Sequence, residues 1–284
     1  MTLQDYLDRY NLQNDIKPST YDHYFWVVQS LNSHLCRQAE LSELSAELFN
    51  RYLLALRERG ISPFTAKNRR NSLLVLWRSA WRDGLAPPVE EVRRVRTPEP
   101  SKDVWAADEV VRLIRACRAL RGYFRRTDIL RANYFETMIM AAYDTGLRRS
   151  DLHRIRVEDI ILSQFGVVQQ KTSRVVVVRL NTDTLCKIKE FVCGVTRQHV
   201  WPKWSKRREA FSRMFKRIVE VAGLQGTFCK IRRTSGTEVE RQRHGCAWLH
   251  LGHTSPDTAR RWYINPERAY DIDRPLPPPL DIDR

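Results

Sequence analysis

The chain has 284 residues, enough for two ordinary domains with separate hydrophobic cores. Its 49 lysines and arginines outnumber its 33 acidic residues and give a formal net charge of +16, so a polyanionic partner is the first expectation. No apolar run is long enough to span a membrane, the N-terminus lacks a secretory-signal pattern, and the six cysteines form no CxxC pair. These features argue against a membrane protein or a secreted disulfide-rich protein, and they predict a cytoplasmic protein with reduced thiols.

The first part of the chain, residues 3–84, has helical periodicity. A helix predicted within residues 42–59 ends at a glycine, and the next helix opens with Ser62 as N-cap and Pro63 at the first helical position. Apolar residues at three- and four-residue spacing predict that the second helix buries a stripe made of Leu73, Leu74, Trp77 and Trp81.

The first turns of this second helix carry basic and polar side chains. A charge run of this kind is usually a solvated face, but in a basic protein it is equally typical of contacts to nucleic-acid phosphates or grooves. The side chains that we expect to contact nucleic acid are Thr65, Lys67, Asn68 and Arg70, together with Arg207 and Arg208 in the second half of the chain.

Prolines and mixed charge then break the periodicity at residues 87–88 and 93–100, which predicts an interdomain linker. A second domain begins near Lys102. It is predicted to be mostly helical, with helices at 107–115 and 134–143 and an amphipathic helix that ends at Gly223 and carries Phe211, Phe215, Ile218 and Ala222.

The second domain also contains one sheet signal. The segments 160–170 and 174–180 are rich in valine and isoleucine and predict a β-hairpin with Lys171 in its turn. At the C-terminus, residues 271–284 repeat the tetrapeptide DIDR around a proline core. Such a tail has too few apolar residues to form a core of its own.

Three short segments carry the residues that suggest chemistry. The run LGHTSPDTARRWY, residues 251–263, sets a histidine ten residues ahead of a tyrosine, and the upstream segments TGLRRSD and CKIRRT supply arginines. A tyrosine oxygen can be a nucleophile, and fixed arginines can clamp a phosphoryl group during its transfer. Each residue alone also fits a structural role, but together they indicate chemistry on a nucleic-acid phosphodiester.

In this order the segments resemble the tyrosine recombinases, the phage-integrase-type site-specific recombinases. Residues 1–97, including the run SPFTAKNRR, resemble their helical core-binding (SAM-like) domain, residues 98–270 resemble their catalytic domain, and residues 271–284 form the proline-rich tail. The resemblance therefore implies a mostly α (α+β) fold with a small β-sheet in the second domain.

The resemblance also implies roles for six residues of this chain. Arg148 and Arg232 match the two catalytic arginines, and Asp151 matches the acidic residue that orients the site. Lys171 matches the hairpin lysine, which is the general acid for the leaving 5′-oxygen. His253 matches the histidine near the nucleophile. Tyr263 matches the nucleophile itself, which becomes a 3′-phosphotyrosine.

One catalytic position departs from the family pattern. Three residues before the second arginine the family usually has a histidine, and this chain has Cys229 followed by Lys230. A thiol neither shares a proton at neutral pH as an imidazole does nor carries a positive charge. Because Lys230 is the next residue on a helix or strand, its side chain is expected to point in a different direction from that of Cys229. We therefore expect altered proton handling at this position, and losing one acid–base group typically costs about two to four decades of rate.

The activity implied by the resemblance is cleavage and rejoining of DNA strands through a covalent phosphotyrosine, without a metal or ATP. Two arginines bind the developing charge that a divalent cation neutralises in many phosphoryl-transfer enzymes, and the sequence has no GxxxxGK[ST] loop. The implied partners are double-stranded DNA and further copies of the chain, with a dimer on one site and a tetramer on paired sites. The implied location is the cytoplasm, in association with the nucleoid.

Three alternatives remain open at this point. Cys229 fits a DNA-binding relative with a weakened active site, although the other catalytic groups are all present. The same chemistry also serves type IB topoisomerases and telomere resolvases, which the short N-terminal domain disfavours. A zinc site is a weaker possibility because the sequence lacks a CxxC or HxxxH pair; its ligands would be Cys246, His250 and His253, with Cys229 or His244.

Overall fold

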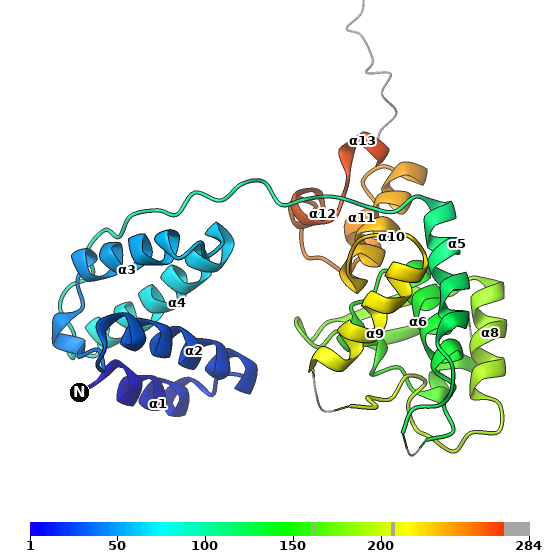
Figure 1. Cartoon of the computed structure of the whole chain (residues 1–284), viewed down its shortest axis with the longest axis horizontal. Coiled ribbons are helices and arrows are strands. Elements are labelled where there is room, and N and C mark those ends of the chain that lie inside the picture. Colours follow the sequence, from blue (N-terminus) through cyan, green and yellow to red (C-terminus); the bar gives the residue numbers. More distant parts are fainter. Residues whose placement is uncertain (126, 162, 206–207, 270–284) are drawn as a thin grey trace, which may run out of the picture. The chain divides into compact units, whose positions relative to one another are not determined.

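The computed structural model describes residues 1–125, 127–161, 163–205 and 208–269. The chain divides into two compact units, Met1–Glu99 and Pro100–Arg284, and each unit has its own hydrophobic core (Figure 1). The described residues are mostly helical with one two-stranded sheet, which confirms the predicted mostly α (α+β) class. Arg207 and the tail 271–284 lie outside the described residues, as does the side chain of Arg208.

The N-terminal unit is a small helical domain. Three of its four α-helices begin at a capping hydroxyl, supplied by Thr2, Ser45 and Ser62. Ser62 caps its helix as predicted, because its Oγ accepts the N–H of Thr65 at 3.2 Å and Pro63 occupies the first turn. The elements are α1 (Leu3–Asn14), α2 (Pro18–Leu35), the 3₁₀ turn η1 (Leu41–Glu43), α3 (Ala46–Glu58) and α4 (Pro63–Arg82).

Helix α4 packs against the other three helices of this unit, and Trp77 lies fully buried at the centre. Its ring meets that of Phe49 edge-on, with centroids 5.2 Å apart, and its Nε1–H donates to the carbonyl of Pro87 at 3.0 Å. The packing of aromatic rings in this geometry stabilises a core beyond the area that they bury.

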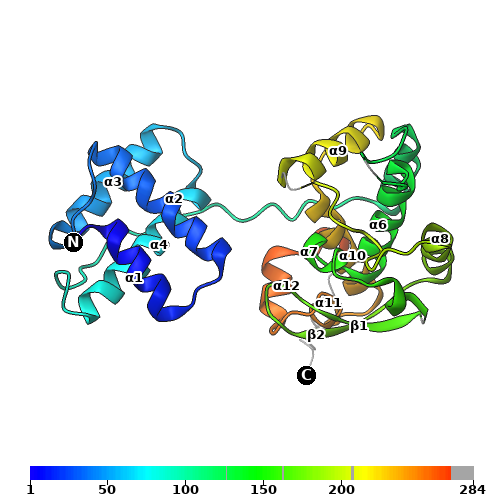
Figure 2. The same cartoon turned by 90° about the horizontal axis from the view of Figure 1, so that it is seen from below.

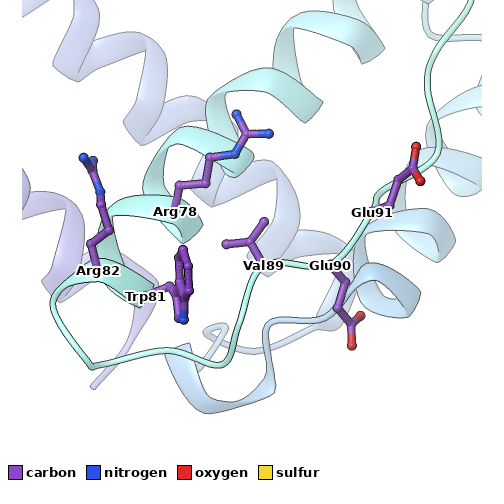
Figure 3. Close-up of a pocket in the computed structure, with 6 residues that line it drawn as sticks. All are labelled: Arg78, Trp81, Arg82, Val89, Glu90 and Glu91. Carbon is purple, nitrogen blue, oxygen red and sulfur yellow. The ribbon is translucent and has the colours of Figure 1, made fainter.

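The predicted stripe on α4 is confirmed for its first three members and wrong for Trp81. Leu73, Leu74 and Trp77 are buried, but Trp81 is 47% exposed. Trp81 lines a surface pocket together with Arg78 and Val89 (Figure 3). The buried face of α4 continues instead through Ala80, so Trp81 falls at the border of that face.

The segment after α4 has no helix, and its first half packs on the N-terminal unit. Val92 is buried, and the N–H of Arg93 donates to Asn50 at 2.9 Å. The guanidinium of Arg70 donates to the carbonyls of Val92 and Arg93, at 2.7 Å and 2.8 Å. Arg70 therefore secures the start of the predicted linker.

The C-terminal unit surrounds a buried helix, α6, against which α5, α8 and α10 pack (Figure 1). No helix in the described part of the chain has the length and apolar character needed to cross a bilayer. The elements are α5 (Ala107–Ala116), η2 (Cys117–Ala119), α6 (Arg131–Thr145), α7 (Arg149–Leu152), η3 (Val157–Ile161), β1 (Gln164–Val168), β2 (Val175–Arg179), α8 (Thr182–Val192), α9 (Arg208–Val221), α10 (Phe228–Gln242), α11 (Ala247–His250), α12 (Pro256–Trp262) and α13 (Pro266–Ala269).

Strands β1 and β2 form the predicted hairpin (Figure 2). They pair antiparallel with Val168 opposite Val175, and alternate valines face the core. The turn is closed by the N–H of Ser173, which donates to the carbonyl of Gln169 at 2.8 Å. This geometry places Lys171 at the exposed tip of the hairpin, as predicted.

The two tryptophans of α4 give a matched test of this packing. Trp77→Ala should lower the free energy of unfolding of the N-terminal unit by about 3–5 kcal/mol, because it leaves a cavity in a closed core. Trp81→Ala should lower it by less than about 1 kcal/mol, since this ring is half exposed. Denaturant titration of the full chain measures both values, and equal losses would contradict the assignment of the buried face.

Candidate active site

The first arginine of the site follows a turn that strongly favours glycine. Helix α6 ends at Thr145, and Gly146 adopts a φ of +61°. A Cβ on Gly146 would also come within 2.8 Å of His250 Nε2 and of Leu251 Cδ2. The turn sends the chain into α7, whose N-cap residue is Arg148.

Arg148 is fixed from two sides. Its Nη1 donates to Oε1 of Gln169 at 3.2 Å and lies 3.8 Å from Oδ2 of Asp151. Asp151 is fully buried, and its Oδ1 accepts the backbone N–H of Gln170 at 2.8 Å. The carboxylate therefore joins the hairpin turn to Arg148, which fits the orienting role expected for Asp151.

Gln169 is a site residue that the sequence analysis missed. It is fully buried, and besides accepting from Arg148 it accepts from Thr172 Oγ1 at 2.9 Å and donates to the carbonyl of Leu251 at 3.3 Å. A Cβ on Gly252 would lie 2.7 Å from Gln169 Nε2, so this approach needs a glycine. Its only sequence signal is its place at the start of the hairpin turn.

The second arginine, Arg232, projects from α10 and is 4% exposed. Its Nη1 donates to the carbonyl of Gly146, and its Nη2 donates to the carbonyl of Leu251 at 2.7 Å. Leu251 therefore accepts from both Arg232 and Gln169, and Gln169 in turn holds Arg148. A continuous chain of hydrogen bonds connects the two arginines.

Burial is the main feature of the Arg232 guanidinium. Burial and then the positive charge of Arg148 lower the pKa of Arg232, Tyr263 and Asp151 oppose the change, and the net result is a pKa of about 10. Arg232 still carries its charge at neutral pH. Its Nε is buried without a described hydrogen-bond partner. A buried cation held mainly by neutral carbonyls attracts an anion strongly.

His253 and Tyr263 complete the cluster around Arg232. Nε2 of His253 lies 3.0 Å from Nη2 of Arg232, and the rings of His253 and Tyr263 have centroids 4.8 Å apart. The guanidinium carbon of Arg232 lies 5.0 Å from the centre of the tyrosine ring. Helix α12 positions Tyr263, whose N–H donates to the carbonyl of Ala259 at 2.9 Å.

The His253 imidazole is neutral at pH 7. Burial lowers its pKa to about 4, and the positive charges of Arg232, Arg148 and Lys171 lower it in the same direction. A guanidinium only donates hydrogen bonds, so Nε2 of His253 accepts and the ring proton is on Nδ1. This Nδ1 is buried without a described partner.

The remaining predicted site residues are not among the buried groups of this cluster. Lys171 is exposed at the hairpin tip and acts on His253 through its charge. Cys229 is exposed on the first turn of α10. On α4 in the N-terminal unit, Thr65 and Asn68 are exposed and Lys67 is half-buried.

Lys230 points away from the site, as expected. Its Nζ lies 2.5 Å from Oδ2 of Asp103 and 5.1 Å from the centre of the Trp105 ring. Three residues further along α10, Arg233 donates to the carbonyl of Ser101 at 2.6 Å. The segment 101–105 is therefore anchored to the start of α10 by two neighbouring cationic side chains.

The histidines of the zinc alternative are engaged in other contacts. Nε2 of His250 lies 2.7 Å from Oγ of Ser235, and Nε2 of His253 faces Arg232. Among the described residues no group of three or more His, Cys, Asp or Glu side chains is arranged to hold a metal ion. The geometry therefore gives the zinc alternative no support.

The site therefore places Tyr263 beside the buried Arg232 and a neutral histidine, and hydrogen bonds link Arg232 to Arg148. This arrangement is typical of a phosphoryl-transfer site with a tyrosine nucleophile. The model of the Phage integrase family matches residues 104–269, more than half of the chain. The chain therefore belongs to the phage integrase family, the tyrosine recombinases. No curated protein sequence matches it significantly.

Solved structures share the fold. A lambda integrase dimer bound to a COC′ core site aligns with a TM-score of 0.74 at 23% identity, over 95% of this chain and 79% of that one. The Tn1549 transposon integrase, in complex with circular intermediate DNA, aligns with a TM-score of 0.67 at 13% identity, over 95% and 97%. XerH recombinase bound to a palindromic difH substrate aligns with a TM-score of 0.61 at 17% identity, over 77% and 68%.

The two buried histidines predict how stability depends on pH. Burial, followed by the charge of Arg232, lowers the pKa of His250 and of His253 to about 4. Histidine in the unfolded chain titrates at about 6.5, so between these values the unfolded chain binds more protons than the folded chain. The stabilisation is complete above pH 6.5 or so and is lost as the pH falls toward 4.

The thermal unfolding temperature of the C-terminal unit should therefore decrease as the pH is lowered from 7 to 4.5. His250→Gln and His253→Gln should each weaken this dependence, because glutamine does not titrate. Thermal unfolding at a series of pH values measures the slope. If both variants keep the wild-type slope, these histidines do not titrate as described.

Proposed function

We propose that the chain is a site-specific DNA recombinase or integrase whose nucleophile is Tyr263. The observation that carries the proposal is the contact of the Tyr263 ring with both His253 and the buried Arg232. Family membership and the net charge of +16 support DNA as the substrate. The double strand would be cut and rejoined without an external energy source, because the covalent intermediate conserves the energy of the phosphodiester bond.

In the proposed cleavage step, the partly exposed Tyr263 hydroxyl gives its proton to solvent water and its oxygen attacks the phosphorus. The bond from phosphorus to O5′ breaks, leaving a 3′-phosphotyrosine and a free 5′-hydroxyl. Lys171 is proposed to give a proton to the leaving O5′, which suits a solvent-exposed ammonium at a hairpin tip. Attack by a 5′-hydroxyl on the phosphotyrosine reverses these changes and rejoins the strand.

Negative charge develops on the non-bridging oxygens during this step. The guanidinium groups of Arg148 and Arg232 are proposed to bind those oxygens, since planar forks suit two oxygens at once. The Nδ1–H of His253, which has no described partner, is proposed to supply a further donor. Donors that are fixed before the reaction stabilise the transition state without reorganising.

The proposed partners follow from the related structures. Lambda integrase is seen as a dimer on a core site and as a tetramer on a Holliday junction, and the Tn1549 integrase is bound to circular intermediate DNA. By analogy, we propose a dimer on one site and a tetramer on paired sites, with the nucleoid as location. The proposed DNA contacts in the N-terminal unit are Thr65, Lys67, Asn68 and Arg70.

A nicked suicide DNA that releases a short strand on cleavage tests the nucleophile. Wild type should accumulate a covalent protein–DNA adduct on a denaturing gel, and Tyr263→Phe should form none while retaining its DNA affinity. Arg148→Lys and Arg232→Lys should each slow adduct formation by about 10²–10³-fold, because each removes a two-pronged donor.

Arg241→Lys is the matched control for Arg232, because Arg241 lies on the same helix and is exposed. It should cleave at the wild-type rate. An adduct with Tyr263→Phe would reject the assigned nucleophile. The absence of an adduct with wild type, on DNA that it binds, would favour the alternative of a DNA-binding relative.

Cys229 is the residue that specifically supports the alternative of a DNA-binding relative with a weakened active site. A single substitution at this position tests that alternative. Cys229→His restores the imidazole of the family pattern at an exposed position on α10, so it should fold normally. We expect cleavage of the suicide DNA to become faster, by up to about 10²-fold, because one acid–base group is regained. Cys229→Ser should cleave no faster than wild type. Equal rates for all three proteins would show that the position takes no part in proton handling.

A further inference from the structure

His250 is a buried histidine that no step of the proposed mechanism uses. It ends the short helix α11, three residues before His253. Its Nε2 lies 2.7 Å from Oγ of Ser235 on α10, and the same Oγ donates to the carbonyl of Tyr143 on α6 at 2.5 Å. One imidazole and one hydroxyl therefore connect three helices that meet at the site.

The hydroxyl determines which nitrogen of His250 carries the proton. Ser235 has one hydroxyl hydrogen, and the carbonyl of Tyr143 can only accept it. Oγ must then accept from the imidazole, so Nε2 of His250 is protonated and donates. A neutral ring satisfies this pattern. In agreement, burial and then the charge of Arg232 lower the pKa of His250 to about 4.

The ring of His250 also packs against the turn that holds Arg232. A Cβ on Gly146 would come within 2.8 Å of His250 Nε2 and 3.1 Å of its Cδ2, so the ring fills the space beside this glycine. The carbonyl of Gly146 accepts Nη1 of Arg232. His250 therefore contacts both sides of that hydrogen bond. Its ring packs directly against Gly146, and its Nε2 contacts Ser235, which lies three residues after Arg232 on α10.

We infer that His250 is a positioning residue for Arg232. The Nε2–H of His250 holds α10 and the end of α6 in register, and the ring keeps the Gly146 carbonyl where it orients the guanidinium. This role rests on the proposed function of Arg232 in cleavage. Because Nε2 of His250 is committed to Ser235, His250 does not take over the proton transfer expected of a histidine at position 229.

Three substitutions of His250 separate the hydrogen bond from the bulk of the ring. His250→Gln places an amide N–H near the position of Nε2, His250→Asn is too short to reach it, and His250→Leu keeps an apolar side chain without a donor. The readouts are the single-turnover rate of adduct formation on suicide DNA at saturating protein and the dissociation constant of the DNA complex.

We expect His250→Leu and His250→Asn to slow adduct formation by about 10- to 100-fold, because a misplaced catalytic group costs rate steeply. Their DNA dissociation constants should stay within about twofold of wild type, since affinity is spread over many basic residues. His250→Gln should recover most of the rate. Leu249→Gln is the control, because Leu249 lies on the same turn and is exposed.

The inference is overturned if His250→Leu cleaves as fast as wild type, if rate and affinity fall together, or if His250→Gln is as slow as His250→Leu. A second measurement does not depend on cleavage. Nitrogen NMR of the wild-type protein should show His250 as the neutral Nε2–H form at pH 7, and a ring that titrates near its ordinary pKa would also overturn the inference. Failure of wild type to form any adduct would instead count against the proposed function.

Discussion

The burial of one guanidinium group is the constraint on which the rest of the site depends. Arg232 is almost completely removed from solvent, and it is held by the carbonyls of Gly146 and Leu251. A cation in this position is costly unless its donors are satisfied. The chain satisfies the two terminal nitrogens with backbone carbonyls from two separate turns, whereas Nε has no described partner. These carbonyls neutralise no charge, so the site retains the positive potential that a phosphodiester needs.

Arg148 is positioned relative to Arg232 through shared hydrogen-bond acceptors. Leu251 accepts from Arg232 and from Gln169, and Gln169 accepts from Arg148. Two guanidinium groups of like charge would otherwise repel each other. Their separation is instead set by a rigid path of hydrogen bonds, and the buried carboxylate of Asp151 lies against the more exposed arginine. This arrangement supports the proposal that both guanidinium groups bind one phosphate.

Much of the fold and the order of the site residues could be predicted from the sequence, because they depend on local patterns. The N-cap at Ser62 and the hairpin around Lys171 follow from neighbouring residues. Exposure of Trp81 could not be predicted, since helical periodicity does not say which later segment covers a face. Gln169 was missed for a related reason: its partner Leu251 lies 82 positions away along the chain and offers only a backbone carbonyl.

The anchoring of residues 101–105 on α10 has a mechanical consequence. Asp103 and Ser101 are bound by Lys230 and Arg233, side chains that flank the position of Arg232 on the same helix. The connecting peptide thus has a fixed point before it enters the C-terminal core. The helix that carries the buried arginine therefore also fixes where residues 101–105 lie on the C-terminal unit.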